Sequence, residues 1–325
     1  MKGAASDGKL HQERELSMEQ YGLVISEHCY LRQAPGISAE KNDSGIEDEI
    51  FSGWAVRMFP ETQENGWIKV ETHYGYDGFV SLECLRALDQ EELRERQDKK
   101  QFLRIGIGEA DLLQIPKVQG LPLELLLKNA IVELLGREEE KGWSRVRTAS
   151  GQEGYVHTEY LRERKDDDGY FFRGKDYFRA HVQEMEITDE DALRENLVSS
   201  AMAFLGTQYR WGGKSSQGID CSGLVFTSYM ENGVLIYRDA KLVEEYPVDA
   251  IEVSELKKGD LIFFPGHVAM YIGKDHFIHS TAYASTPYVT INSLNPADAD
   301  YREDLHHQIE GCGSLFPTVP DGCRN

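Results

Sequence analysis

Apolar residues at helical spacing mark two segments in the C-terminal half of this chain of 325 residues. The polar sequence Thr188-Asp189-Glu190-Asp191 is typical of a helix start. The apolar residues that follow it at helical spacing are Leu193, Leu197, Ala201, Phe204 and Leu205. A second set, Leu224, Val225, Ser228 and Tyr229, follows Cys221 at i+3, i+4, i+7 and i+8. The pattern predicts one helix that ends at Gly206 and another that begins at Cys221 and ends at Gly233.

Continuous apolar runs further on predict three strands, at residues 258–264, 267–273 and 276–280. Pro265 and Gly266 form a tight connection between the first two strands. Antiparallel pairing of the second and third strands would bring His267 and His279 close together.

The first half of the chain contains a repeat at an offset of 76 residues, the distance from Trp67 to Trp143. Gly66-Trp67-Ile68-Lys69-Val70 matches Gly142-Trp143-Ser144-Arg145-Val146, and Asp77-Gly78-Phe79-Val80 matches Glu153-Gly154-Tyr155-Val156. Each copy predicts two strands around a glycine turn, closed by Leu85 or Leu161. Units of this length are expected to be small all-β barrels, with the two tryptophans in their cores.

The formal charge of −21 makes nucleic acids and anionic membranes poor partners. No window approaches the eighteen apolar residues of a membrane-spanning helix. The first twenty residues lack the apolar region of a signal peptide. The expected location is therefore the cytoplasm, and the alternative is a secreted protein whose leader has been removed.

Five cysteines form no C-x-x-C pair, so neither a disulfide scaffold nor a zinc ribbon is indicated. Cys312 and Cys323 could pair only in an exported protein. His306 and His307 lie in the same tail, but the spacing of the group fits no standard zinc motif. We expect no metal and no cofactor.

Cys221 is expected at a helix N-terminus, where the helix dipole can lower the pKa of a thiol. A helix packed on the predicted sheet would bring this thiol to His267. Cys221, His267 and His279 then form a set of nucleophile, base and orienting group. On residue chemistry alone, a buried structural thiol is the favoured alternative.

Five blocks of the C-terminal half occur in one order: Tyr209-x-Trp211-Gly212-Gly213, Gly218-x-Asp220-Cys221-Ser222-Gly223-Leu224, Gly259-Asp260-Leu261-Ile262-Phe263, His267-Val268-x-x-Tyr271-Ile272-Gly273 and Phe277-Ile278-His279. This order resembles the NlpC-type cysteine peptidases, which cut bacterial cell-wall peptides. The resemblance implies an α+β, papain-like domain with Cys221 as nucleophile, His267 as base and His279 as third member. It also implies that Tyr209 lies near the oxyanion site, where its hydroxyl would act with the Cys221 backbone N–H. One departure, Lys241-Leu242-Val243-Glu244-Glu245 in place of a glutamine common in the family, concerns substrate details.

The repeated pattern G-W-x-x-V, G-(F/Y)-V and L in the first half resembles bacterial SH3 domains. The expected organisation is a first barrel at 20–90, a second barrel at 100–163, a linker at 164–187 and the catalytic domain at 188–325. The charged run 89–100 is expected to be a linker or short helix between the barrels.

NlpC-type enzymes fused to bacterial SH3 domains include murein-recycling endopeptidases, and they resemble this chain in domain order and size. The resemblance implies cleavage of the γ-D-glutamyl–diamino acid bond of murein peptides with a free N-terminal L-Ala. Asp220 and Ser222 match family positions that hold the substrate amine, and Asp220 is also suited to capping the helix. Tyr76, which the second repeat replaces by Gln152, corresponds to a tyrosine that reaches the substrate's amino end. Arg210 and Lys214 are candidates to receive the substrate carboxylates.

Three other functions stay open on the sequence. One is a secreted peptidoglycan hydrolase whose SH3 domains bind the cell wall. Another is a non-enzymatic wall-binding module with an inert thiol, and the third is acyl transfer by the same Cys–His pair. The oligomeric state is also open.

Overall fold

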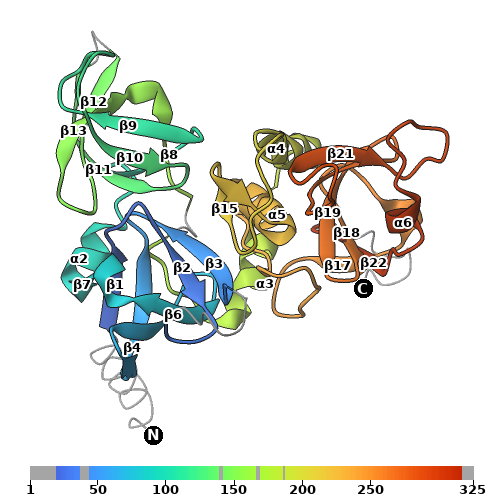
Figure 1. Cartoon of the computed structure of the whole chain (residues 1–325), viewed down its shortest axis with the longest axis horizontal. Coiled ribbons are helices and arrows are strands. Elements are labelled where there is room, and N and C mark those ends of the chain that lie inside the picture. The colour runs from blue at the N-terminus through green and yellow to red at the C-terminus, as the bar shows by residue number, and fades with distance from the viewer. Residues whose placement is uncertain (1–19, 37–43, 139–141, 166–168, 186, 317–325) are drawn as a thin grey trace, which may run out of the picture.

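The structure is a computed structural model that describes residues 20–36, 44–138, 142–165, 169–185 and 187–316. Figure 1 shows two β units at one side and, at the other, a mixed unit in which helices pack beside a sheet. The α+β architecture expected for the C-terminal half is therefore present.

The first unit is a seven-stranded sheet in the order β3-β2-β6-β5-β4-β1-β7. Its elements are β1 (Gln20–Val24), β2 (His28–Arg32), β3 (Ile46–Phe51), β4 (Ala55–Glu64), β5 (Trp67–Glu71), β6 (Asp77–Ser81), the short helix η1 (Leu82–Cys84) and β7 (Leu85–Leu88). Helix α2 (Gln90–Glu95) follows it, capped by the Asp89 side chain, within the charged run expected to be a linker or short helix.

The second unit repeats this arrangement strand for strand, in the order β10-β9-β13-β12-β11-β8-β14. Its elements are β8 (Phe102–Ile105), β9 (Glu109–Leu113), β10 (Pro122–Leu127), β11 (Ile131–Glu138), β12 (Trp143–Arg147), β13 (Glu153–His157), η3 (Thr158–Tyr160) and β14 (Leu161–Arg162). The hairpins also share one register, since Trp67 pairs with Ser81 and Trp143 with His157. Trp143 is buried as expected, but Trp67 is half-buried, and Trp54 is the tryptophan buried in the core of the first unit.

The first barrel shares one continuous apolar core with the C-terminal half. The second barrel has a core of its own and adds Phe102, Leu127, Ile131 and Ala149 to the shared core. Tyr74 of the first barrel packs on Phe226 with 4.6 Å between ring centroids. Gly212 lies so close to the first barrel that a Cβ atom would be 2.3 Å from Ile46 Cγ2, and its φ of +72° also favours glycine. The first barrel is thus built into the catalytic half.

The segment 164–187, expected to be a linker, is docked along much of its described length. Arg164 donates a hydrogen bond of 2.7 Å to the Phe102 carbonyl, and the buried Tyr170 donates one to Gly53. Helix α3 (Lys175–Glu184) stacks Phe178 on Tyr246, with 4.8 Å between ring centroids. This helix was not expected because the segment is polar, although Phe178 is buried and Tyr177 and Val182 pack against the shared core.

The C-terminal unit packs helices on a six-stranded sheet in the order β17-β22-β18-β19-β20-β21. Its elements are α4 (Glu190–Met202), β15 (Lys214–Ser215), β16 (Gly218–Ile219), α5 (Cys221–Met230), β17 (Asp249–Ile251), η4 (Val253–Glu255), β18 (Leu261–Phe264), β19 (His267–Gly273), β20 (His276–Ser280), β21 (Val289–Ser293), α6 (Glu303–His306) and β22 (Gly311–Ser314). Asp189 caps α4, within the polar sequence expected to open this helix. Helix α5 is entirely buried and packs on β19 and β20, so its N-terminus faces the start of β19. Within the described residues, no helix combines the length and apolarity needed to cross a bilayer.

Candidate active site

Cys221 is the first residue of α5, as the sequence predicts, and Asp220 caps that helix. One Asp220 oxygen accepts the backbone N–H of Gly223 at 2.5 Å, and the other accepts that of Gly212 at 2.8 Å. Gly223 has no room for a side chain, because a Cβ would lie 2.2 Å from the Gly213 carbonyl oxygen. The Asp-Cys-Ser-Gly sequence therefore holds the thiol at a rigid helix end.

Cys221 is 6% exposed, and its thiol accepts hydrogen bonds from the backbone N–H groups of Val268 and Ser222. Val268 directly follows His267, so the strand that carries the proposed base lies against the thiol. Burial raises the pKa of Cys221 to about 12, and the nearby carboxylate of Asp220 adds to the rise. In the free protein, burial thus opposes the lowering of this pKa that is expected at a helix N-terminus.

His267 and His279 meet as the strand pairing predicts: β19 and β20 are antiparallel, and His267 Nε2 lies 2.8 Å from His279 Nδ1. Asn292, on β21, places its Oδ1 atom 3.0 Å from His279 Nε2, while its Nδ2 donates to the Asp300 carbonyl. The amide orientation of Asn292 is thereby fixed.

These contacts assign the protons of the two imidazoles. Because Asn292 Oδ1 can only accept, His279 carries its proton on Nε2 and offers the lone pair of Nδ1 to His267. His267 then donates from Nε2 and keeps an unprotonated Nδ1. Burial lowers the pKa of His267 to about 4 and that of His279 to about 3, so both rings are neutral at pH 7. The pair thus supplies a neutral base with one defined tautomer.

A cleft of about 400 Å³ opens over the thiol. Its lining comes from both halves of the chain: Gln33, Glu47, Tyr209, Trp211, Asp220, Cys221, Ser222, Asp239, Ala240, Lys241 and Gly266. Tyr209 lines it as expected, and burial raises the pKa of its phenol, so its hydroxyl stays protonated and can donate. The exposed Trp211 donates a hydrogen bond of 2.9 Å from Nε1 to the Ile46 carbonyl, which connects the rim of the cleft to the first barrel.

Tyr76 lies beside this cleft, in an adjoining pocket that shares Asp239 and Lys241 with it. Its hydroxyl lies 3.0 Å from Asp239 Oδ1 and 3.3 Å from Glu47 Oε2. The Tyr76 hydroxyl has one proton to donate to these two carboxylates, so most of their hydrogen-bond acceptor positions stay available for a ligand. Tyr76 therefore reaches the cleft through two acidic residues that the sequence reasoning did not single out.

Asp220 and Ser222 both contact Arg238, a buried residue that the sequence reasoning did not single out. Arg238 Nη1 donates to Ser222 Oγ at 2.8 Å and to Asp220 Oδ1 at 3.3 Å. Its Nε donates to Asp48 Oδ1 of the first barrel at 2.6 Å. No local pattern could have revealed this contact, because the two residues are 190 positions apart.

Lys214 and Arg210, expected to receive substrate carboxylates, are engaged elsewhere. Lys214 is buried, with its Nζ 3.0 Å from Asp48 and 2.6 Å from the Tyr74 hydroxyl. Arg210 donates to the Tyr30 hydroxyl at 3.1 Å. The cation that lines the cleft is Lys241.

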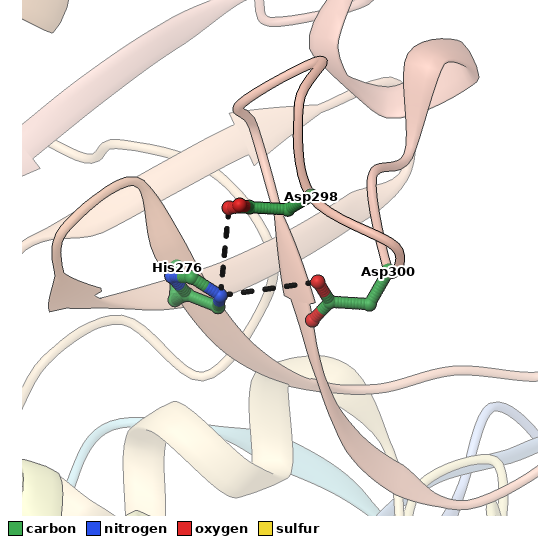
Figure 2. Close-up of side chains that lie close together, drawn as sticks. All are labelled: His276, Asp298 and Asp300. Carbon is green, nitrogen blue, oxygen red and sulfur yellow. Dashed lines mark ion pairs between the residues drawn. The ribbon is translucent and has the colours of Figure 1, made fainter.

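One set of three side chains of types that can bind a metal occurs among the described residues (Figure 2). Its histidine, His276, is the first residue of β20, three residues before His279. His276 Nε2 lies 3.7 Å from Asp298 and 3.8 Å from Asp300, and its Nδ1 donates to the Lys274 carbonyl. All three side chains are partly exposed, and the contacts of His276 with the two carboxylates and with the Lys274 carbonyl account for the geometry. In the tail, His306 Nδ1 contacts the Tyr301 hydroxyl and Cys312 is a free, buried thiol, while Cys323 lies outside the described residues.

Comparison with known proteins agrees with this site. A model of the NlpC/P60 family matches residues 206–300, and a model of the bacterial SH3 domain matches residues 116–162, within the second barrel. Dipeptidyl-peptidase 6 of Lysinibacillus sphaericus is 35% identical over 90% of this chain and 99% of its own length. A γ-D-glutamyl-L-lysine dipeptidyl-peptidase of Bacillus cereus is 33% identical over 74% of this chain and 68% of its own.

Among solved structures, an NlpC/P60 family protein from Bacillus cereus shares the fold with a TM-score of 0.67 at 22% identity. The match covers 91% of this chain and 100% of that one, so the similarity extends through both barrels and the catalytic half. From the cysteine at the helix end, the paired histidines and a relative matched over nearly its full length, we conclude that this chain belongs to the NlpC/P60 family of cysteine peptidases.

Proposed function

We propose that this protein is a cysteine endopeptidase that hydrolyses the γ-D-glutamyl–diamino acid bond of short murein peptides with a free N-terminal L-Ala. Two of its relatives are named γ-D-glutamyl-L-lysine dipeptidyl-peptidases, and a third is named dipeptidyl-peptidase 6. Release of a dipeptide requires an enzyme to recognise the amino end of its substrate at a fixed distance from the nucleophile.

The observation that carries the proposal is the acidic end of the cleft. Glu47 of the first barrel and Asp239 of the catalytic half line the cleft that contains Cys221, and both lie against the Tyr76 hydroxyl. Two carboxylates facing one space favour an ammonium group. Tyr76 is thus proposed to contribute to the amine site together with Glu47 and Asp239, while Asp220 and Ser222 hold the side next to the thiol.

The histidine pair supports a general-base mechanism for the attack. His267 Nδ1 accepts the thiol proton as sulfur attacks the γ-carbonyl carbon of D-glutamate. The resulting imidazolium keeps its Nε2–H on His279 Nδ1, which stabilises the new charge. The Tyr209 hydroxyl and the Cys221 backbone N–H are proposed to donate to the oxyanion. His267 then protonates the leaving amine, and water hydrolyses the thioester.

The first barrel supports selection of short peptides over intact cell wall. Gln33 and Glu47 form one wall of the cleft, and Trp211 is tied to the same barrel. An ammonium site at this end of the cleft would favour peptides whose L-Ala amine is free over peptides whose L-Ala is attached to glycan. We therefore propose a cytoplasmic role in murein recycling.

Mass spectrometry of peptide digests tests the proposal. The wild type should cleave L-Ala-γ-D-Glu-diamino acid peptides between D-glutamate and the diamino acid, and Cys221→Ala should not. N-acetylation of L-Ala should cost about 2–5 kcal/mol in kcat/KM, because it removes the charge that would pair with the Glu47 and Asp239 carboxylates. Equal rates on free and acetylated peptides would refute recognition of the amine, and turnover by Cys221→Ala would refute the mechanism.

A secreted peptidoglycan hydrolase is the second candidate, favoured by the separate core of the second barrel. Such a barrel could bind cell wall without disturbing the cleft. Cosedimentation with purified sacculi and fractionation of the producing cells distinguish the two: retention on sacculi and an extracellular location would replace the recycling role.

A further inference from the structure

Strand β3 of the first barrel presents three consecutive acidic residues, Glu47, Asp48 and Glu49, to the catalytic half. Glu47 lines the cleft, whereas Asp48 and Glu49 are fully buried. Glu49 accepts the backbone N–H of Lys214 at 2.6 Å and lies 3.2 Å from the Ser215 hydroxyl. Asp48 makes a different set of contacts, and these lead to the nucleophile.

Asp48 is the only described carboxylate that contacts both Lys214 and the Arg238 side chain. Its oxygens accept from Arg238 Nε at 2.6 Å, from Lys214 Nζ at 3.0 Å and from the Tyr74 hydroxyl. Burial pushes the pKa of Asp48 up, but Lys214, Arg238 and Tyr74 outweigh burial and hold it below its ordinary value. Asp48 is therefore an anion at neutral pH.

Arg238 carries this contact forward to both residues that flank Cys221. Its Nη1 bonds Ser222 Oγ at 2.8 Å, and its two terminal nitrogens lie 3.3 Å from the two oxygens of Asp220. The planar guanidinium can satisfy three partners at once only in one orientation. With its Nε held by Asp48, the other two nitrogens have fixed directions.

We infer that Asp48 of the first barrel is a positioning residue for the peptidase reaction, because it orients Arg238 and through it the Asp220 and Ser222 side chains on either side of Cys221. The carboxylates of Asp48 and Asp220 contact the cations Arg238 and Lys214, and all four side chains are buried. Without Asp48, the terminal nitrogens of Arg238 keep Asp220 and Ser222 as partners, but its Nε loses its acceptor. The first barrel thus contributes Asp48 to the buried side of the active site, in addition to lining the cleft with Glu47.

The test rests on the proposed function, since it measures cleavage of the free-amine murein peptide. Asp48→Asn keeps the side-chain shape and removes the charge. We expect it to lower kcat/KM about tenfold or more. Glu49→Gln is the matched control, because it lies on the same strand, is equally buried and does not contact Arg238, and it should stay within about twofold of wild type.

A double-mutant cycle separates positioning from general destabilisation. If Asp48 acts through Arg238, Asp48→Asn should lower kcat/KM no further in an Arg238→Gln background. If Asp48 supports only the fold, the two losses should multiply.

Should Asp48→Asn fail to fold, the pair Asp48→Asn with Lys214→Met restores charge balance and is compared with Lys214→Met alone. The inference is overturned if folded Asp48→Asn keeps the wild-type kcat/KM, or if the double variant has the same kcat/KM as Lys214→Met alone. It is also overturned if the losses of Asp48→Asn and Arg238→Gln multiply in the cycle. Failure of wild type and Glu49→Gln to cleave the peptide would instead refute the proposed function.

Discussion

Replacing Asn292 by leucine removes the acceptor that fixes the tautomer of His279. Asn292 Oδ1 lies 3.0 Å from His279 Nε2, and His279 is fully buried. An unsatisfied buried N–H costs about 1–3 kcal/mol. Much of this cost is avoided if the proton of His279 moves to Nδ1, which lies 2.8 Å from His267 Nε2. His267 must then carry its own proton on Nδ1, where it can no longer accept one from the thiol.

This free energy predicts a loss of about 5- to 150-fold in kcat, since 1.4 kcal/mol corresponds to a factor of ten. KM should change by less than about twofold, because Asn292 is not among the residues that line the cleft. Steady-state hydrolysis of the free-amine peptide measures both constants, and thermal unfolding shows whether the variant is folded.

Thr290→Val is the control for Asn292→Leu. Thr290 lies on the same strand and pairs through its backbone with His279, so its replacement perturbs β21 at the same depth. We expect kcat of Thr290→Val to match wild type. A wild-type kcat in folded Asn292→Leu, or a change confined to KM, would refute the tautomer argument.

Three further predictions concern the amine site, the buried charges and acid stability. Glu47→Gln should lower kcat/KM on the free-amine peptide but leave the residual rate on the acetylated peptide unchanged, and an equal loss on both peptides would contradict an ammonium site. Lys214→Met should lower the free energy of unfolding by about 3–5 kcal/mol in urea titration, because it leaves the buried Asp48 carboxylate short of a cation, whereas Lys258→Met, at an exposed pair, should cost less than about 1 kcal/mol. Burial lowers the pKa of His73 from its ordinary 6.5 to about 3. Between these two pH values the unfolded chain binds a proton at His73 that the native state does not bind, so the free energy of unfolding falls as the pH falls. His73→Phe should therefore lose about 2 kcal/mol less than wild type between pH 6.5 and 5, and parallel pH curves for the two proteins would exclude this origin.

The positions of Cys221, His267 and His279 in the fold could be predicted, because each depends on the spacing of apolar residues within a short segment. The apolar spacing after Cys221 defines a helix that begins at the thiol. The two strands after Pro265 pair antiparallel, which brings the rings of His267 and His279 together. The repeat at 76 residues likewise predicts two units with the same hairpin register. In each case the interacting residues lie within one helix or one hairpin.

The rest of the site depends on contacts between distant segments. In the sequence, Glu47-Asp48-Glu49 has the composition of a solvated acidic strand, and only the tertiary structure shows that Lys214 and Arg238 bury it. Lys214 was misassigned for the same reason: a lysine in a loop is usually exposed, and here a carboxylate from another domain compensates its burial. The pKa of Cys221 also depends on burial by tertiary packing, which local helix geometry does not report.

The shared core of the first barrel and catalytic half has a consequence for synthesis of the chain. The ribosome releases β3 well before it makes Lys214 and Arg238, so Asp48 and Glu49 wait without their cations while more than 160 further residues are added. During that interval these carboxylates and the apolar face of the first barrel that will pack on α5 stay exposed to water. The second barrel, which has its own core, can fold as soon as it emerges. A truncated transcript that ends after the barrels would therefore yield a product in which the later-made barrel is the better folded of the two.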